Sequence, residues 1–348
     1  MPARAVTCAP PGGRGLSVAP IGFVELARLQ KPERLRRRVL GPSFAFADGS
    51  RTWLFSGTNL VPGGAPPAPR TPFNHPHAAR SGDDKPWQAA TGATWALREE
   101  LDASGLPQPV LRLPENEPDG SITWEPISLV TSGAAHALLY LARGRGLEDP
   151  NEVYLAELAP GASELTNLRA APLFGAGEPL FARGALRQGD RVLLFACDKV
   201  THACKLARAP LARAAERAAY EFYARDAAGQ WSWQSDVALA TPVLERLGDA
   251  LSFDWNRYLD AYLVVHGEDL SNDIVLESAR TLEGPWTRVV LPWKSPSAWW
   301  ITQLRQQPRL VDDCDKRVHI SYFEPAPPEP MDTLPSSGDV VLGYVDLQ

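Results

Sequence analysis

Cysteine, histidine and methionine are scarce in this sequence, whose 348 residues include four Cys, six His and two Met. The cysteines form no CxxC pair, and no cysteine or histidine follows the spacing of a zinc site. The G-x-S-x-G turn of Ser/His/Asp hydrolases is missing, and so is the rest of a phosphate-binding fingerprint around Gly144 and Gly146. We therefore expect no metal, no cofactor and no serine-hydrolase chemistry.

Long apolar runs and an excess of one charge are also absent. No apolar run approaches the roughly 20 residues that span a bilayer, so we expect no transmembrane segment. The 35 basic and 41 acidic residues are mixed along the chain and give a formal net charge of −6. No basic stripe is available to neutralise phosphates, which argues against nucleic acid as a partner. The one basic cluster, within residues 31–38, is expected to be a solvated turn rather than an anion site.

Two of the four cysteines, Cys197 and Cys204, flank a short loop between strand-like runs. They can face each other across a hairpin, so the sequence predicts a disulfide between them. A second disulfide, Cys8 with Cys314, is predicted where the chain ends meet. The first 20 residues contain no hydrophobic signal core, so either a signal was removed or the protein is cytosolic. Because disulfides form in oxidising compartments, we expect an extracytoplasmic protein: secreted, periplasmic or surface-anchored.

Glycine and proline, by contrast, are plentiful, and the 27 Gly and 33 Pro punctuate the whole chain instead of gathering in one linker. Helical periodicity is limited to residues 210–219, PLARAAERAA, where one short helix is expected. The eleven Trp suit strands, where a large ring covers a half-buried surface. This composition is typical of many short strands joined by turns.

Five strand–turn–strand units follow one another along the chain. Their first strands are expected at residues 43–47, 127–131, 181–186, 251–255 and 307–311. Their second strands are expected at residues 51–55, 136–141, 191–196, 261–265 and 317–323. Third strands are expected at residues 92–97, 152–158, 204–208, 273–279 and 340–345, and fourth strands at residues 109–113, 168–173, 220–225 and 286–291.

These units predict an all-β fold, a five-bladed β-propeller built from four-stranded antiparallel blades. The fifth unit lacks a fourth strand, and residues 25–40 could supply it by pairing the N-terminal segment with the last blade. Such closure removes the exposed sheet edges that invite aggregation. We therefore expect a flexible N-terminal segment, residues 1–24, followed by a single propeller domain, residues 25–348.

Two segments resemble known propellers. Residues 48–64, DGSRTWLFSGTNLVPGG, resemble a first blade that reads DGr-x-W-x-FGDT, and residues 251–287 resemble a fourth blade that ends in A-x-x-x-x-GPW. With WEP at residues 124–126 and with residues 151–158, the likeness extends over about residues 40–347. The chain is thus similar to the bacterial five-bladed propeller family that includes endo-D-arabinanases. That family is related to the furanosidase propellers, which cleave arabinans, xylans and fructans, so the resemblance implies a polysaccharide or other glycan as the partner.

Three polar positions of that family are altered in this chain. Ser56 stands where the family has the acidic residue of GDT, and Gln307-Pro308-Arg309 replaces a His-Pro-Glu at the start of the fifth blade. Residues 41–44 offer no match for the Asp that these glycosidases place on the first innermost strand. These departures argue against hydrolysis and favour a binding role.

Glycoside hydrolysis needs two carboxylates flanking one bond. In a propeller the first strand of each blade lines the central channel. The carboxylates on or beside these strands are Glu125 and Asp254, with Arg183 as a charge partner and Asp249 in reserve. Asp254 has an alternative interpretation as a turn residue before Asn256, and Glu125 as a residue that begins a strand.

Further residues are candidates for contacts with the saccharide: Arg183, His75, Trp124, Trp300, Asn256 and Gln307. The indole of Trp300 offers a flat apolar face to a sugar ring, although it could instead pack between blades. His75 lies two residues before His77 and could touch a sugar or a metal. No third ligand is near in sequence, so a solvated loop is the alternative.

Two functions remain open on these observations. The first is a carbohydrate-active propeller, a glycoside hydrolase that acts on a furanoside polysaccharide such as arabinan, with Glu125 and Asp254 as its catalytic carboxylates. The second is a catalytically inactive propeller that binds a glycan or a protein partner. The fold cannot decide between them, because function belongs to the site and not to the scaffold.

Overall fold

The computed structural model of the chain describes residues 15–30, 35, 37–45, 51–61, 71–73, 77–81, 93–95, 97–99, 101, 103, 107, 108, 110, 122–132, 136–145, 151–159, 162, 164–198, 200–245, 251–268, 271–297, 299–307, 314–327 and 337–348. These residues form strands with three short 3-10 turns, η2 (Leu211–Arg213), η3 (Arg217–Ala219) and η4 (Val237–Leu239). The single short helix expected at residues 210–219 is therefore replaced by η2 and η3. No helix in the described part of the chain is long and apolar enough to cross a membrane.

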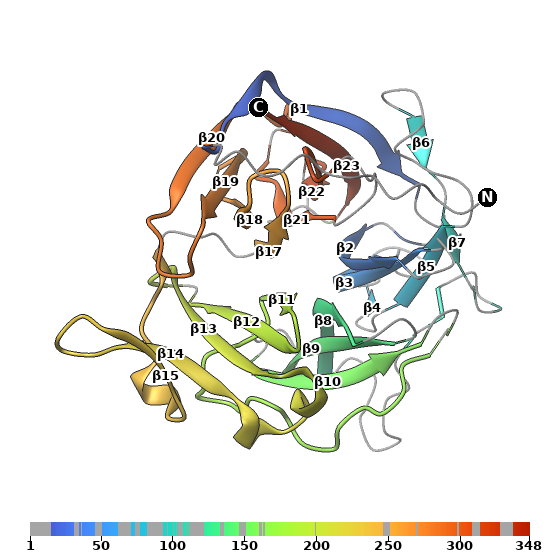
Figure 1. Cartoon of the computed structure of the whole chain (residues 1–348). Helices are drawn as coiled ribbons and strands as arrows, with labels where there is room; N and C mark the ends of the chain where they lie inside the picture. Colours follow the sequence, from blue (N-terminus) through green and yellow to red (C-terminus); the bar gives the residue numbers. More distant parts are fainter. Residues whose placement is uncertain are drawn as a thin grey trace, which may run out of the picture.

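The described strands form five sheets that are arranged around a common centre (Figure 1). The first sheet contains β2 (Arg37–Ala45), β3 (Arg51–Val61), β5 (His77–Ser81) and β7 (Arg98–Glu99), with β4 (Thr71–Phe73) beside β3. The second contains β8 (Ile122–Thr131), β9 (Ala137–Arg145) and β10 (Glu152–Leu158). The third contains β11 (Gly184–Gln188), β12 (Arg191–Cys197), β13 (Ala203–Pro210), β14 (Glu221–Arg225) and β15 (Trp231–Gln234), with β16 (Leu244–Glu245) beside β13.

The last two sheets complete the circle. The fourth contains β17 (Leu251–Asn256), β18 (Ala261–Gly267), β19 (Asp273–Ala279) and β20 (Thr287–Lys294). The fifth contains β21 (Thr302–Gln306), β22 (Arg317–Pro325), β23 (Gly338–Leu347), β1 (Val18–Leu29) and β6 (Ala93–Trp95). The fold is thus an all-β propeller.

The first strand of each unit lies innermost, and neighbouring innermost strands contact one another around the whole circle (Figure 1). The contacts run from β2 to β8, β11, β17 and β21, and from β21 back to β2. Because residues of these five strands meet at one centre, side chains distant in sequence are brought into one place.

Apolar clusters fill the spaces between neighbouring sheets. Between the third and fourth sheets, the ring of Phe195 on β12 stands edge-on to that of Phe253 on β17, with 4.3 Å between centroids. Between the first and second sheets, Leu54 on β3 packs in one buried cluster with Leu139 and Leu141 on β9. The middle strands are buried on both faces, which explains their continuous apolar runs.

Most second and third strands are confirmed at the predicted positions, and three strand predictions are wrong. The last innermost strand is β21 (Thr302–Gln306), which ends before the predicted range of residues 307–311. The third strand of the first sheet is β5, whereas residues 93–95 of the predicted strand form β6 and pair in parallel with β1. The predicted strand at residues 168–173 is an irregular segment, and most of that at residues 109–113 lies outside the described residues.

The N-terminal strand β1 pairs antiparallel with β23, from Val18 opposite Leu347 to Arg28 opposite Val341. The strand thus begins before the boundary expected at residue 25, and it ends at Leu29. The later part of the predicted pairing segment, from Arg37, belongs to β2 of the first sheet instead.

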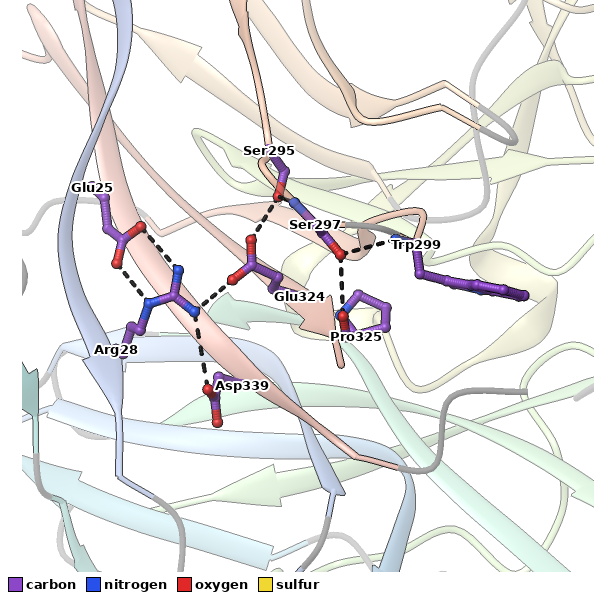
Figure 2. Close-up of polar contacts among 8 residues, drawn as sticks. All are labelled: Glu25, Arg28, Ser295, Ser297, Trp299, Glu324, Pro325 and Asp339. Atoms are coloured by element: carbon purple, nitrogen blue, oxygen red, sulfur yellow. Dashed lines mark hydrogen bonds and ion pairs between the residues drawn. The ribbon is translucent and has the colours of Figure 1, made fainter. Parts of the chain in front are cut away.

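A polar network joins β1 to the rest of the last sheet (Figure 2). Arg28 donates hydrogen bonds to Glu25 on its own strand and to Glu324 on β22, and it lies 3.9 Å from Asp339 on β23. Ser295 donates to the second oxygen of Glu324, at 2.7 Å. Because the Arg28 side chain is 37% exposed, these ion pairs add little stability, and the backbone ladder and the apolar packing hold the strand.

The predicted disulfide between Cys197 and Cys204 is confirmed, and it joins the ends of β12 and β13. Cys314 is also disulfide-bonded. Its predicted partner, Cys8, lies outside the described residues.

We expect the double variant Cys197→Ala/Cys204→Ala to lose about 2 kcal/mol of unfolding free energy. The two cysteines are only seven positions apart, so the bond closes a short loop. A short loop removes little entropy from the unfolded chain, and the expected stabilisation is therefore at the low end of the range for disulfides. Urea denaturation followed by tryptophan fluorescence measures the loss. Val200→Ala, in the same loop at a residue 86% exposed, is the control and should leave the midpoint unchanged. Equal midpoints for the double variant and the wild type would show that the bond does not stabilise the hairpin.

Candidate functional site

A cavity of about 230 Å³ lies where the five innermost strands meet. Each of the five strands contributes to its lining: β2 through Ser43, β8 through residues 127–131, β11 through residues 184–187, β17 through residues 251–254 and β21 through Arg305 and Gln306. Arg183, just before β11, also lines it. The cavity therefore exists because the sheets converge, and no single segment forms it.

Asp254 is the one carboxylate among the described residues that line this cavity. It lies in the second half of β17, opposite Leu263 of β18, and its side chain is partly exposed. One of its oxygens, Oδ1, accepts a hydrogen bond from the backbone N–H of Trp255 at 2.8 Å. The strand thus fixes the carboxylate at the cavity, and the turn that follows β17 begins three residues later, at Arg257.

Arg305 is the most deeply buried charge of the cavity, with 5% of its surface exposed. Its guanidinium donates one hydrogen bond, from Nη1 to the carbonyl oxygen of Ile127 on β8. The Nε–H group has no partner among the described residues. Burial lowers the pKa of Arg305 to about 10, the negative charge of Glu125 raises it, and the positive charge of Arg183 lowers it. The three side chains therefore share one electrostatic environment.

Glu125 lies on β8, opposite Ala142 of β9, and it is buried, with 7% of its surface exposed. Glu125 does not line the cavity. Arg305 does line it, and the negative charge of Glu125 acts on Arg305. The structure thus brings the two candidate carboxylates to the same region in different settings. Asp254 faces the cavity, and Glu125 is a buried counter-charge for an arginine that faces it.

Two further arginines line the cavity near β11. The Arg183 guanidinium has no hydrogen-bond or ion-pair partner within the described part of the chain. Arg187, at the exposed rim, donates to the carbonyl oxygens of Gly189, at 3.0 Å, and Thr131, at 3.3 Å. The described lining therefore contains three guanidinium groups and one carboxylate, although the whole chain has a net charge of −6.

Four of the predicted saccharide contacts lie outside the cavity lining, and three of them, Trp124, Asn256 and Gln307, are accounted for within the fold. Trp124 is buried between sheets, edge-on to Tyr154 at 5.0 Å. Asn256 bridges the turn after β17 to the carbonyl oxygen of Asp315, at 2.9 Å. Gln307 is buried and donates to the hydroxyl of Ser321 on β22, at 2.7 Å. In each case packing or a hydrogen bond within the fold accounts for the residue. His75, a further candidate, lies outside the described residues.

Trp300 is exposed at 43% of its surface and stands just before β21, with its ring 5.6 Å from that of Trp299. Ser297 fixes this segment, since its hydroxyl donates to the carbonyl oxygen of Pro325 and accepts from the N–H of Trp299 (Figure 2). Figure 2 shows the Trp299 ring pointing away from the Arg28 network. The two indoles form an aromatic surface that is separate from the lining of the cavity.

Sequence reasoning missed Arg305, Ser128 and Gln306, which all line the cavity. A position on an innermost strand would have identified Arg305, but the sequence prediction placed that strand at residues 307–311, after Arg305. With the strand at Thr302–Gln306, Arg305 belongs to an innermost strand like Asp254. In the described residues, no group of three or more His, Cys, Asp or Glu side chains is placed to hold a metal ion.

The sequence matches no family model and no curated protein. Among solved structures, a protein from Bacteroides ovatus that is proposed to be a hydrolase has a TM-score of 0.56 at 10% identity, over 92% of this chain and 86% of that chain. A GH62 hydrolase in complex with xylotriose has a TM-score of 0.51 at 11% identity, over 94% and 97% of the two chains. The RS223 β-xylosidase has a TM-score of 0.50 at 9% identity, over 91% and 98%. At such low identity these similarities show a common fold, the β-propeller.

Proposed function

We propose that this chain is a carbohydrate-active propeller whose central cavity receives a saccharide. The observation that carries the proposal is Asp254, a carboxylate held by an innermost strand on the lining of that cavity. Ser128 and Gln306 also line the cavity and add polar residues to it. A shared fold with a xylotriose-binding hydrolase and a xylosidase is consistent with this function.

The activity that we propose is hydrolysis of a glycosidic bond in a furanoside polysaccharide such as arabinan. Asp254 and Glu125 are the two carboxylates that the mechanism requires. One donates a proton to the leaving oxygen, and the other either activates the attacking water or attacks the anomeric carbon. Arg183 contributes a positive charge beside them.

A second candidate is a propeller that binds a glycan and does not cleave it. The burial of Glu125, together with its absence from the cavity lining, favours this alternative. A buried carboxylate that balances the charge of Arg305 has a structural role that needs no catalysis. Ser56 and Gln307 also favour the alternative, because they stand where related glycosidases have other polar residues.

The two candidates are separated by assaying the purified chain on arabinan, xylan and galactan. Release of reducing ends measures hydrolysis, and calorimetric titration with oligosaccharides of each polymer measures binding. Release of sugar supports the hydrolase. Binding without release supports the glycan-binding propeller, and neither release nor binding contradicts both.

Three further features belong to the same proposal. Each of the five sheets is one blade of a single propeller domain, and β1 closes the ring by serving as an outer strand of the last blade. The protein works in an oxidising, extracytoplasmic compartment, which the disulfide between Cys197 and Cys204 supports.

A further inference from the structure

The charges of the cavity point to a narrower class of saccharide than the proposed function requires. A neutral sugar presents hydroxyl groups, and a few polar side chains with aromatic surfaces suffice to bind it. This cavity instead gathers Arg183, Arg187 and Arg305 against the single carboxylate of Asp254 among its described residues. The chain as a whole is acidic, so the concentration of positive charge is local to the cavity.

Arg305 is the strongest observation. A guanidinium removed from water is destabilised unless its N–H groups are bonded and its charge is balanced. Glu125 supplies one negative charge nearby, and Ile127 accepts one hydrogen bond, which leaves the Nε–H of Arg305 without a partner among the described residues. A planar guanidinium that makes a single hydrogen bond within the described residues and lines the cavity suits the paired oxygens of a carboxylate or sulfate group.

Arg183 adds a second cation at the same place. Its charge acts unfavourably on Arg305, and its guanidinium has no partner in the described part of the chain. Two guanidinium groups that repel each other across a cavity are both stabilised when an anion lies between them.

We infer that the cavity binds an acidic saccharide, with the carboxylate or sulfate group of the sugar held between Arg183 and Arg305. This inference rests on the proposed function, since it assumes that the ligand of the cavity is a saccharide. The acidic group selects the ligand, and Asp254 faces the remainder of the sugar.

The test compares ligands that differ in charge and little else. The probes are a trigalacturonate, a sulfated galactotriose and an uncharged galactotriose, each titrated calorimetrically into the full chain at low and at high salt. We expect an acidic probe to bind at least about tenfold more tightly than the neutral one at low salt, because charge-assisted hydrogen bonds are the strong ones. The advantage should shrink at high salt, since salt screens the attraction. The two acidic probes show whether the carboxylate or the sulfate is preferred.

Arg183→Gln is the variant of choice, because this residue is partly exposed and the fold does not depend on its guanidinium. It should remove most of the preference for the acidic probe. Arg213→Gln, which removes the same charge from a side chain 54% exposed on η2, is the control and should keep the preference. Arg305→Lys keeps the buried charge and loses the planar guanidinium. Provided that circular dichroism shows the variant to be folded, its affinity for the acidic probe should also fall.

The outcomes separate this inference from the proposed function. Equal affinity for acidic and neutral probes overturns the inference and leaves the saccharide function intact. A preference for acidic probes that survives Arg183→Gln also overturns it, because the anion would then bind elsewhere. Failure of every saccharide to bind contradicts the proposed function itself.

Discussion

Asp254→Asn is expected to reduce the turnover number for glycoside hydrolysis by about a thousandfold or more, with little change in stability. A positioned acid, base or nucleophile contributes this much to a transition state, and each tenfold loss corresponds to about 1.4 kcal/mol. The amide keeps the shape of the side chain, and its oxygen can still accept the hydrogen bond from the N–H of Trp255. The effect should therefore fall on the turnover number and not on the fold. Reducing-end assays on the polysaccharide that the wild type cleaves measure it.

Asp226→Asn is the matched control for this substitution. Asp226 lies in the turn between β14 and β15, at the periphery of the third sheet, where its Oδ1 accepts a hydrogen bond from the N–H of Gln230. An amide oxygen can accept the same bond, so the control should keep full turnover. If Asp254→Asn is as active as Asp226→Asn, Asp254 is not a catalytic residue and the hydrolase proposal loses the observation that carries it.

Glu125→Gln distinguishes the two roles of the second carboxylate. As a catalytic group, Glu125 should show a loss of turnover comparable to that of Asp254. As a counter-charge only, its substitution leaves Arg305 buried without its balancing charge, which lowers the melting temperature while turnover of the folded fraction is retained. Thermal melting and turnover measured on the same preparation separate these results.

The repeating architecture was predictable because the buried middle strands carry a strong local signal. β10 and β19 lie at the predicted residues, and β18 begins where it was expected, at Ala261. These strands pack on both faces, so apolar and β-branched residues follow one another along them. The signal is local to each strand, and it therefore survives without knowledge of the neighbouring sheets.

The innermost strand of the last sheet shows where this reasoning fails. β21 reads TQLRQ, a sequence that on pattern alone resembles an exposed segment. Its buried Arg305 is stabilised by Ile127 and Glu125, which lie about 180 positions earlier in the chain and in another sheet. A tertiary environment of this kind has no local signal, which is why the sequence predicted Asp254 and Arg183 for the cavity and missed Arg305.

The same limit applies to the edge of the first sheet. β5 reads HAARS and has no apolar run, whereas residues 93–95 read ATW and favour a strand. Both segments are strands, but the propensity of a segment does not specify its partner. β6 pairs with β1 of the last sheet, at Ala27 opposite Ala93, so the sequence predicted a strand there and assigned it to the wrong sheet.

Gly343→Ala is expected to destabilise the protein by about 2–3 kcal/mol or more through the junction of β1 and β23. Gly343 lies on β23 between Glu25 of β1 and Ile320 of β22. A Cβ atom added there would overlap the ring of Phe23 and the carbonyl oxygen of Val24. The ring cannot retreat easily, because Phe23 is buried against Trp293, at 4.7 Å between centroids, and the carbonyl belongs to the backbone of β1.

Relief of this overlap requires β1 to move away from β23, and that movement would break the ladder and open the apolar contact of Phe23. Gly175→Ala is the matched control, since a Cβ atom there meets nothing within 4 Å. Urea denaturation of both variants, followed by tryptophan fluorescence, should place the midpoint of Gly343→Ala well below that of Gly175→Ala. Because β1 would be the strand displaced, limited proteolysis should also cut the variant first within residues 18–29. Equal midpoints for the two variants would mean that β1 does not pack against Gly343 and would contradict closure of the ring by the N-terminal strand.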